Sequence, residues 1–173
     1  MTKPECQIIN RGKIAMLHHP MRRRKNEITD PAQMRDIIRK SPVMRLALCL
    51  DGAPYVIPLS HGYDGEHIYF HCAPEGLKTD ILTKNPRVCG LFEAQAELRR
   101  KGDGPCNWGF DYATVIIHGS VTRVVDPEAK LAALQIITEN YATDAPRVPE
   151  KKIGGVDVWK IEVLEMTGKK SFS

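Results

Sequence analysis

Residues 71–78 combine side chains that could bind an anion and transfer a proton. The β-branched and aromatic residues before His71 predict a strand, and residues 75–84 predict a short helix directly after it. A helix N-terminus offers free backbone N–H groups and a partial positive charge, and Lys78 would add a full charge there. An unperturbed histidine titrates near neutrality, so His71 could donate or accept a proton. The pattern fits a phosphate site, and it fits equally a surface lysine beside an ordinary loop.

The other histidines and the cysteines lack the spacing of a metal site, so we expect no metal. The candidate ligands are His61, His67, His71 and His118, but strand alternation turns His61 away from His71. The five cysteines are odd in number, widely spaced and include no Cys-x-x-Cys pair. This argues against a disulfide framework and a zinc ribbon, and it favours free thiols. Glycine-rich nucleotide loops, the zinc-protease helix motif and the serine nucleophile elbow are also missing.

Length and composition are those of one soluble domain. The chain has 173 residues, of which 42% are hydrophobic and 27% are charged. We expect an N-terminal extension over residues 1–28 and a single domain over residues 29–173. No stretch is apolar enough for a signal peptide or a membrane span, so the expected location is the cytoplasm, without membrane contact.

Positive charge is concentrated in the extension. Residues 1–28 contain seven Lys or Arg and two Glu, a balance of +5, so the rest of the chain carries −1 of the total +4. A nearly neutral body argues against nucleic-acid binding. Residues 22–25 are all basic and could hold a phosphate or an acidic partner, or they could form a solvated arm.

The elements that would position residues 71–78 begin with a helix and a predicted meander. Asp30 before Pro31 predicts a helix start, and Ser41 before Pro42 predicts its end. Asp-Gly pairs at 51–52 and 64–65 separate β-rich runs, which predicts three consecutive antiparallel strands over residues 43–50, 54–61 and 66–72.

A two-residue turn at 64–65 would give this meander one polar and one apolar face. It would place Ser60 opposite Tyr69 and Pro58 opposite His71 on the polar face. The apolar face would consist of Ile57, Leu59, Phe70 and Cys72.

The remaining chain predicts two more helices and three more strands. The helix over residues 75–84 would bury Leu77, Ile81 and Leu82, and a second capped helix would run from Asp126 to about Tyr141. Strands are expected over residues 88–98, 110–125 and 156–164. Six antiparallel strands with open edges invite aggregation, so we expect them to close into a barrel with peripheral helices.

Several ordered segments resemble the nitroimidazole-reductase-like branch of the pyridoxamine-5′-phosphate-oxidase-like flavoproteins. The matching segments are residues 21–24, 45–48, 54–59, 62–65, 68–71, 75–78, 85–89 and 112–115, followed by Gly119. The resemblance covers roughly residues 21–125 of the chain.

The resemblance implies a mainly β fold, a six-stranded antiparallel split β-barrel, that forms a homodimer with FMN at each of two subunit interfaces. The substrate would be a small aromatic or heterocyclic molecule, with His71 as the catalytic group. The FMN ring would lie along residues 56–60, and its phosphate near Lys78, with Arg45 or Arg22 as further contacts. The implied cofactor residues are Arg45, Val56, Ile57, Pro58, Leu59, Ser60, His71, Ala73, Lys78, Tyr112 and Thr114.

Two other functions remain open at this point. The protein could be a flavin carrier or sensor without catalysis. It could also bind haem, as related split barrels do, with His61, His71 or His118 as the axial ligand.

Overall fold

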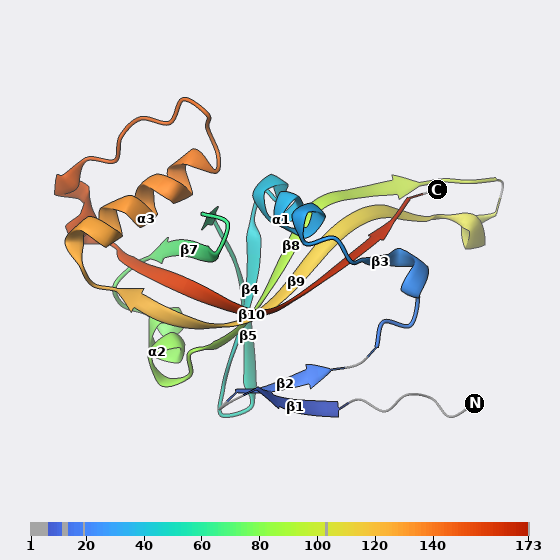
Figure 1. Cartoon of the computed structure of the whole chain (residues 1–173), viewed down its shortest axis with the longest axis horizontal. Coiled ribbons are helices and arrows are strands. Elements are labelled where there is room, and N and C mark those ends of the chain that lie inside the picture. Colours follow the sequence, from blue (N-terminus) through green and yellow to red (C-terminus); the bar gives the residue numbers. More distant parts are fainter. Residues whose placement is uncertain (1–6, 12–13, 19, 103, 173) are drawn as a thin grey trace.

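The fold is organised around one antiparallel sheet that draws strands from most of the chain. The computed structural model describes residues 7–11, 14–18, 20–102 and 104–172. Within them the strand order is β5-β4-β8-β9-β10-β7-β6, with β3 attached to β10 (Figure 1). The strands are β1 (Gln7–Arg11), β2 (Ile14–His18), β3 (Glu27–Ile28), β4 (Met44–Leu50), β5 (Ala53–Leu59), β6 (Gly62–Tyr63), β7 (His67–Cys72), β8 (Arg87–Arg99), β9 (Gly109–Val124) and β10 (Asp157–Ser171). The helices are α1 (Pro31–Lys40), α2 (Leu77–Lys84) and α3 (Pro127–Glu139).

Helix α1 begins and ends where the sequence predicts. Asp30 accepts a hydrogen bond from the backbone N–H of Ala32 at 2.9 Å, and Pro31 occupies the first helical position. Ser41 follows the helix in an extended conformation. The buried face consists of Met34, Ile37 and Ile38, which join the main hydrophobic core of the sheet.

The predicted three-stranded meander is wrong. Strand β5 pairs with β4, while β7 pairs with β6 and β10, so β5 and β7 do not share a ladder. The predicted pairs of Ser60 with Tyr69 and of Pro58 with His71 are therefore absent. The observed partners are Gly62 for Tyr69 and Val158 for His71.

Two contacts, one within the turn and one with the distant helix α3, account for this difference. Asp64 accepts hydrogen bonds from the backbone N–H groups of Glu66 at 2.8 Å and His67 at 2.6 Å, which makes a wider loop than a two-residue turn. Gly62 approaches the backbone of α3 so closely that a Cβ atom there would lie 2.6 Å from the Ile137 nitrogen. The chain therefore leaves β5 and adds the short strand β6 beside β7.

The predicted apolar face of these strands is nevertheless confirmed. Phe70 and Cys72 are buried in the main core, and Ile57 and Leu59 pack against it. The alternation along each strand fixes which side chains point inward, independently of which strand is the neighbour.

Helices α2 and α3 and strands β8 and β9 lie where expected, with two corrections. Leu77 is 59% exposed and does not join Ile81 and Leu82 in the core. Strand β10 continues to Ser171, beyond the predicted end at residue 164, and its pairing with β9 shifts register at a bulge between Val163 and Glu165. This bulge interrupts the alternation on which the prediction depended.

The antiparallel, mainly β fold with three helices is confirmed, whereas closure of the barrel remains a prediction. The two ends of the strand order, β5 and β6, are separated in sequence only by Ser60 and His61. Among the described residues, no ladder joins these two strands.

The N-terminal extension contains strands that its irregular sequence did not predict. Strands β1 and β2 form a separate two-stranded sheet, and β3 pairs with β10. Ile28 in β3 is buried in the main core. In the described part of the chain, no helix has the length and apolarity needed to cross a membrane.

Candidate functional site

His71 has a buried nitrogen atom without a partner. It lies near the end of β7, and burial, followed by the positive charge of Lys78, lowers its pKa below the ordinary value. Its Nδ1 atom is buried and has no hydrogen-bond partner among the described residues. Buried polar atoms are normally paired, so this atom indicates a place where a ligand could bind.

Lys78 lies in the first turn of α2, as predicted. The helix follows Gly76, whose φ of +118° is a conformation that glycine adopts most readily. Within the described residues, no carboxylate pairs with the half-buried Lys78. The structure therefore brings a cation with no acidic partner and His71 together, through local chain geometry.

The neighbouring contacts of α2 fix its position. Helix α2 packs against β4, and the Asn85 side chain at its C-terminus donates a hydrogen bond to the Cys49 carbonyl at 2.7 Å. Thr79 donates one to the Ala73 carbonyl at 3.2 Å. The backbone oxygen of Ala73 is thus already in use, and α2 lies beside the strand that neighbours β5.

The predicted residues of β5 divide into two groups. Val56, which is 66% exposed, Pro58 and Ser60 face outward, whereas Ile57 and Leu59 pack against the core. Only the first three could therefore contact a ligand through their side chains. Because β5 ends the sheet and has β4 as its only described partner, its outer backbone N–H and C=O groups remain available.

The other predicted residues lie on the outer face of the sheet. Arg45 is opposite Pro58 and forms an ion pair with Glu93 at 3.7 Å. Thr114 on β9 is opposite Glu93 and donates a hydrogen bond to the Lys169 carbonyl at 3.4 Å. The Lys169 ammonium lies 5.8 Å from the centroid of the nearby Tyr112 ring. The structure therefore separates the predicted set into the β7–α2 group and this outer-face group.

The sequence analysis did not consider Lys169, and it named Arg22 as a further contact of the FMN phosphate. Both line a cavity of about 710 Å³ beside β9 and β10, and Lys78 does not line it. Lys169 was missed because it follows the bulge in β10. No group of three His, Cys, Asp or Glu residues in the described chain is arranged to hold a metal ion.

Comparisons with known proteins support the family resemblance described in the sequence analysis. The family model for pyridoxamine 5′-phosphate oxidase matches residues 30–170. A structure from Bacteroides thetaiotaomicron, described as a candidate 5-nitroimidazole antibiotic resistance protein, is 31% identical with a TM-score of 0.73, covering 83% of this chain and 85% of that one.

Two solved structures of lower identity support the fold alone. An FAD-binding protein from Mesorhizobium loti is 20% identical with a TM-score of 0.60, covering 83% of this chain and 96% of that one. A flavocytochrome from Azotobacter vinelandii is 18% identical with a TM-score of 0.75, covering 90% and 73%. An uncharacterized protein from Rhizobium meliloti is 33% identical over 52 residues, which is 30% of this chain and only 34% of that relative.

Proposed function

Because this chain belongs to the pyridoxamine 5′-phosphate oxidase family, we propose that it binds FMN and acts as an oxidoreductase on a small aromatic or heterocyclic substrate. The observation that carries the proposal is the buried, unpartnered Nδ1 atom of His71 beside the Lys78 cation. The similarity to the candidate 5-nitroimidazole resistance protein makes a nitroaromatic substrate the first to test.

The residues present fit a flavin nucleotide. Lys78 and the N-terminal N–H groups of α2 would hold the phosphate. The outer backbone edge of β5 would address the polar edge of the ring, and Val56 and Pro58 would contact its face. Arg45, Tyr112 and Thr114, which form the outer-face group, would complete the pocket.

When bound, the flavin supplies the electron transfer, and the protein supplies placement and electrostatics. Burial and Lys78 lower the pKa of His71, so its ring is neutral at neutral pH and carries one N–H donor and one acceptor. His71 would orient the substrate and hold a proton for it.

We further propose that two copies assemble around shared flavin sites. Two large apolar side chains on the outer face are exposed, Val56 at 66% and Ile116 at 39%. Exposed apolar residues on a sheet face favour an interface, and a two-fold dimer is the commonest assembly. Light scattering of the flavin-loaded protein should give twice the mass of one chain, and a single-chain mass would contradict this arrangement.

Spectroscopy of the purified protein tests the cofactor. We expect flavin absorbance bands, or tight quenching of FMN fluorescence when FMN is added to protein freed of ligand. A colourless protein that does not bind micromolar FMN would contradict the proposal, and a Soret band would indicate haem in its place.

A second measurement tests catalysis. Under anaerobic conditions, the chemically reduced FMN-loaded protein should be reoxidised by a nitroimidazole faster than free reduced FMN. Reoxidation no faster than that of free FMN would indicate a carrier or sensor without activity on this substrate class.

A further inference from the structure

The N-terminal hairpin formed by β1 and β2 lacks a packing partner within its own chain. Its two strands pair over Gln7–Arg11 and Ile14–His18 and form a sheet separate from the main one (Figure 1). In the described part of the chain, no helix and no strand of the main sheet makes more than marginal contact with either strand. A single two-stranded hairpin is marginally stable at best in water. The hairpin therefore needs a further surface to pack against.

The register places apolar residues on both faces of this hairpin. Successive residues of a strand lie on opposite faces, and residues that pair directly share a face. One face carries Ile9, Met16 and Ile14, and the other carries Ile8, Leu17 and Ala15. Leaving both faces in water would expose apolar area that the hydrophobic effect disfavours. This composition is typical of a segment that packs against another surface.

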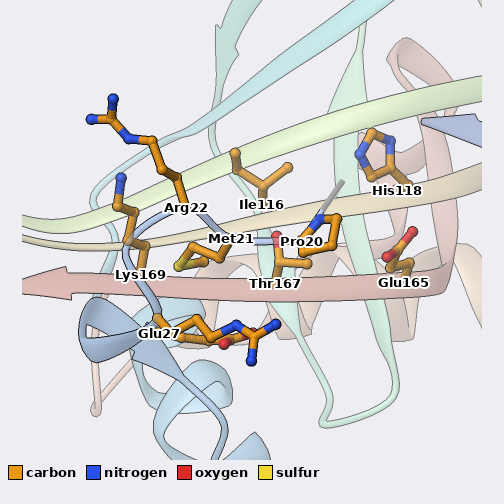
Figure 2. A pocket seen from close by; sticks show the side chains of 10 residues that line it. Pro20, Met21, Arg22, Glu27, Ile116, His118, Glu165, Thr167 and Lys169 are labelled. Atoms are coloured by element: carbon orange, nitrogen blue, oxygen red, sulfur yellow. The ribbon is translucent and has the colours of Figure 1, made fainter. Parts of the chain in front are cut away.

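The segment after the hairpin fixes the place where the hairpin leaves its own chain. Strand β3 pairs Ile28 with Gly168, and a Cβ atom at Gly168 would lie only 2.8 Å from the Ile28 side chain, so only glycine permits this approach. Before β3, the chain passes along the outer face of the sheet, where Met21 and Ile116 line the same cavity (Figure 2). The hairpin therefore begins beside the outer face of β9 and β10.

The outer face is also where the proposed function places a second copy, so this inference rests on that two-copy assembly. The exposed apolar residues Val56 and Ile116 lie there. The chain from His18 to Glu27 in β3 can span at most about 30 Å. Sheets that pack face to face lie about 10 Å apart. This tether is long enough for the hairpin to reach a body that packs on the outer face.

The charge distribution favours contact of the hairpin with the body of a second copy. Residues 1–28 carry a net charge of +5, whereas the rest of the chain carries −1. Two such extensions repel each other, while an extension and a body have net charges of opposite sign. Pairing of the two extensions with each other is therefore disfavoured.

We propose that the hairpin of each copy crosses to the other copy and packs on its body, so that the two chains exchange their N-terminal extensions. A two-fold dimer accommodates this exchange because both hairpins then occupy equivalent surfaces. Each hairpin buries apolar residues that its own chain does not cover, and the dimer gains contact area beyond the outer faces of the two sheets.

Isotope-filtered NMR on the full chain tests the exchange. Chains with labelled Ile, Leu and Met methyl groups are unfolded together with unlabelled chains and refolded, which gives mixed dimers. Methyl groups of Ile9 and Met16, or of Ile8 and Leu17, should show contacts with body protons of the unlabelled chain. Contacts only within the labelled chain, or random-coil signals for these residues, would overturn the proposal.

Matched variants measure the contribution of the hairpin to the dimer. Ile9→Lys combined with Met16→Lys places two charges on one hairpin face and should raise the dimer dissociation constant about tenfold or more, measured by analytical ultracentrifugation. Val125→Lys is the control, because Val125 is 79% exposed and lies outside the hairpin. An unchanged dissociation constant in the double variant, or an equal rise in the control, would overturn the proposal.

FMN titration beside these measurements separates this inference from the proposed function. A parent dimer that shows contacts between its chains but binds no FMN would leave the exchange standing and refute the flavin function. A dimer that binds FMN while each hairpin contacts only its own chain would do the reverse. A single-chain mass would refute the exchange together with the two-copy assembly, whatever the FMN affinity.

Discussion

Two histidines ten residues apart, His61 and His71, have different surroundings although burial lowers the pKa of both. His61 is completely buried, and its Nε2 atom lies 2.9 Å from the Ile38 carbonyl. Its Nδ1 atom lies 3.4 Å from the Tyr141 hydroxyl, and its ring packs edge-on against Phe92 at 5.0 Å. Both ring nitrogens of His61 are therefore in contact with the protein.

His71 has the opposite character, because its buried Nδ1 atom has no hydrogen-bond partner in the described part of the chain. Its electrostatic neighbour is Lys78, a cation that cannot accept a hydrogen bond from the ring. The difference teaches that burial alone does not distinguish a structural histidine from a functional one. Within the described residues the His71 Nδ1 atom lacks a partner and the His61 nitrogens do not, which makes His71 the candidate for contacting a ligand.

Replacing His61 should have the largest effect on folding. His61→Ala removes a packed ring and leaves the Ile38 carbonyl buried without its partner, which should lower the free energy of unfolding by about 2–4 kcal/mol. Urea denaturation followed by circular dichroism measures this change. His118→Ala, at a partly exposed position on the outer face, is the control and should cost less than about 1 kcal/mol. Equal losses in both variants would refute a structural role particular to His61.

For the site formed by His71 and Lys78, we expect a substitution to lower ligand affinity and not the stability of the fold. Lys78→Ala should weaken FMN binding by about 1–3 kcal/mol, because a charge-assisted contact to the phosphate is lost. Fluorescence titration measures the affinity. Lys84→Ala, an exposed lysine in the last turn of the same helix, should bind FMN like the parent protein. Unchanged FMN affinity in Lys78→Ala would remove Lys78 from the phosphate site.

The pH dependence of stability should reveal His61. Burial lowers its pKa in the folded state, while the unfolded chain has the ordinary value of about 6.5. Stability is therefore fully present above about pH 6.5, and it falls with pH as the unfolded state takes up a proton that the folded state resists, by at most about 1.4 kcal/mol per pH unit.

A His61→Gln variant isolates this contribution from that of His71, which both proteins retain. Urea midpoints at about pH 7.5 and about pH 5.5 should fall more steeply in the parent than in the variant. Parallel pH profiles would mean that His61 is protonated equally in the folded and unfolded states.

Local features of the fold and site were predictable because neighbouring residues determine them. Asp126, like Asp30, caps its helix by accepting a hydrogen bond, at 2.8 Å, from a backbone N–H in the first turn. His71 and Lys78 are brought together by a strand that runs directly into a helix, so eight residues of sequence were enough. The faces of β5 and β7 followed from alternation.

Features that depend on distant contacts were not predictable in this way. The Asp-Gly pairs predicted turns but not that β5 and β7 would separate, which depends on the contact of Gly62 with the α3 backbone. Leu77 was predicted to be buried from helical spacing, although its side of α2 has no neighbouring element to cover it in the described structure. Lys169 was missed because the bulge in β10 breaks the alternation that predicted the strand.

Replacing His71 should change the stability of the fold least, in contrast to replacing His61. His71→Ala should change the free energy of unfolding by less than about 1 kcal/mol, because the ring is only partly buried and its Nδ1 atom has no hydrogen bond to lose. Removing a desolvated polar atom offsets part of the lost packing. Urea denaturation beside His61→Ala tests this, with flavin absorbance to show that the pocket persists. A loss as large as that of His61→Ala would mean that His71 supports the fold, and the unpartnered nitrogen would no longer mark a functional site.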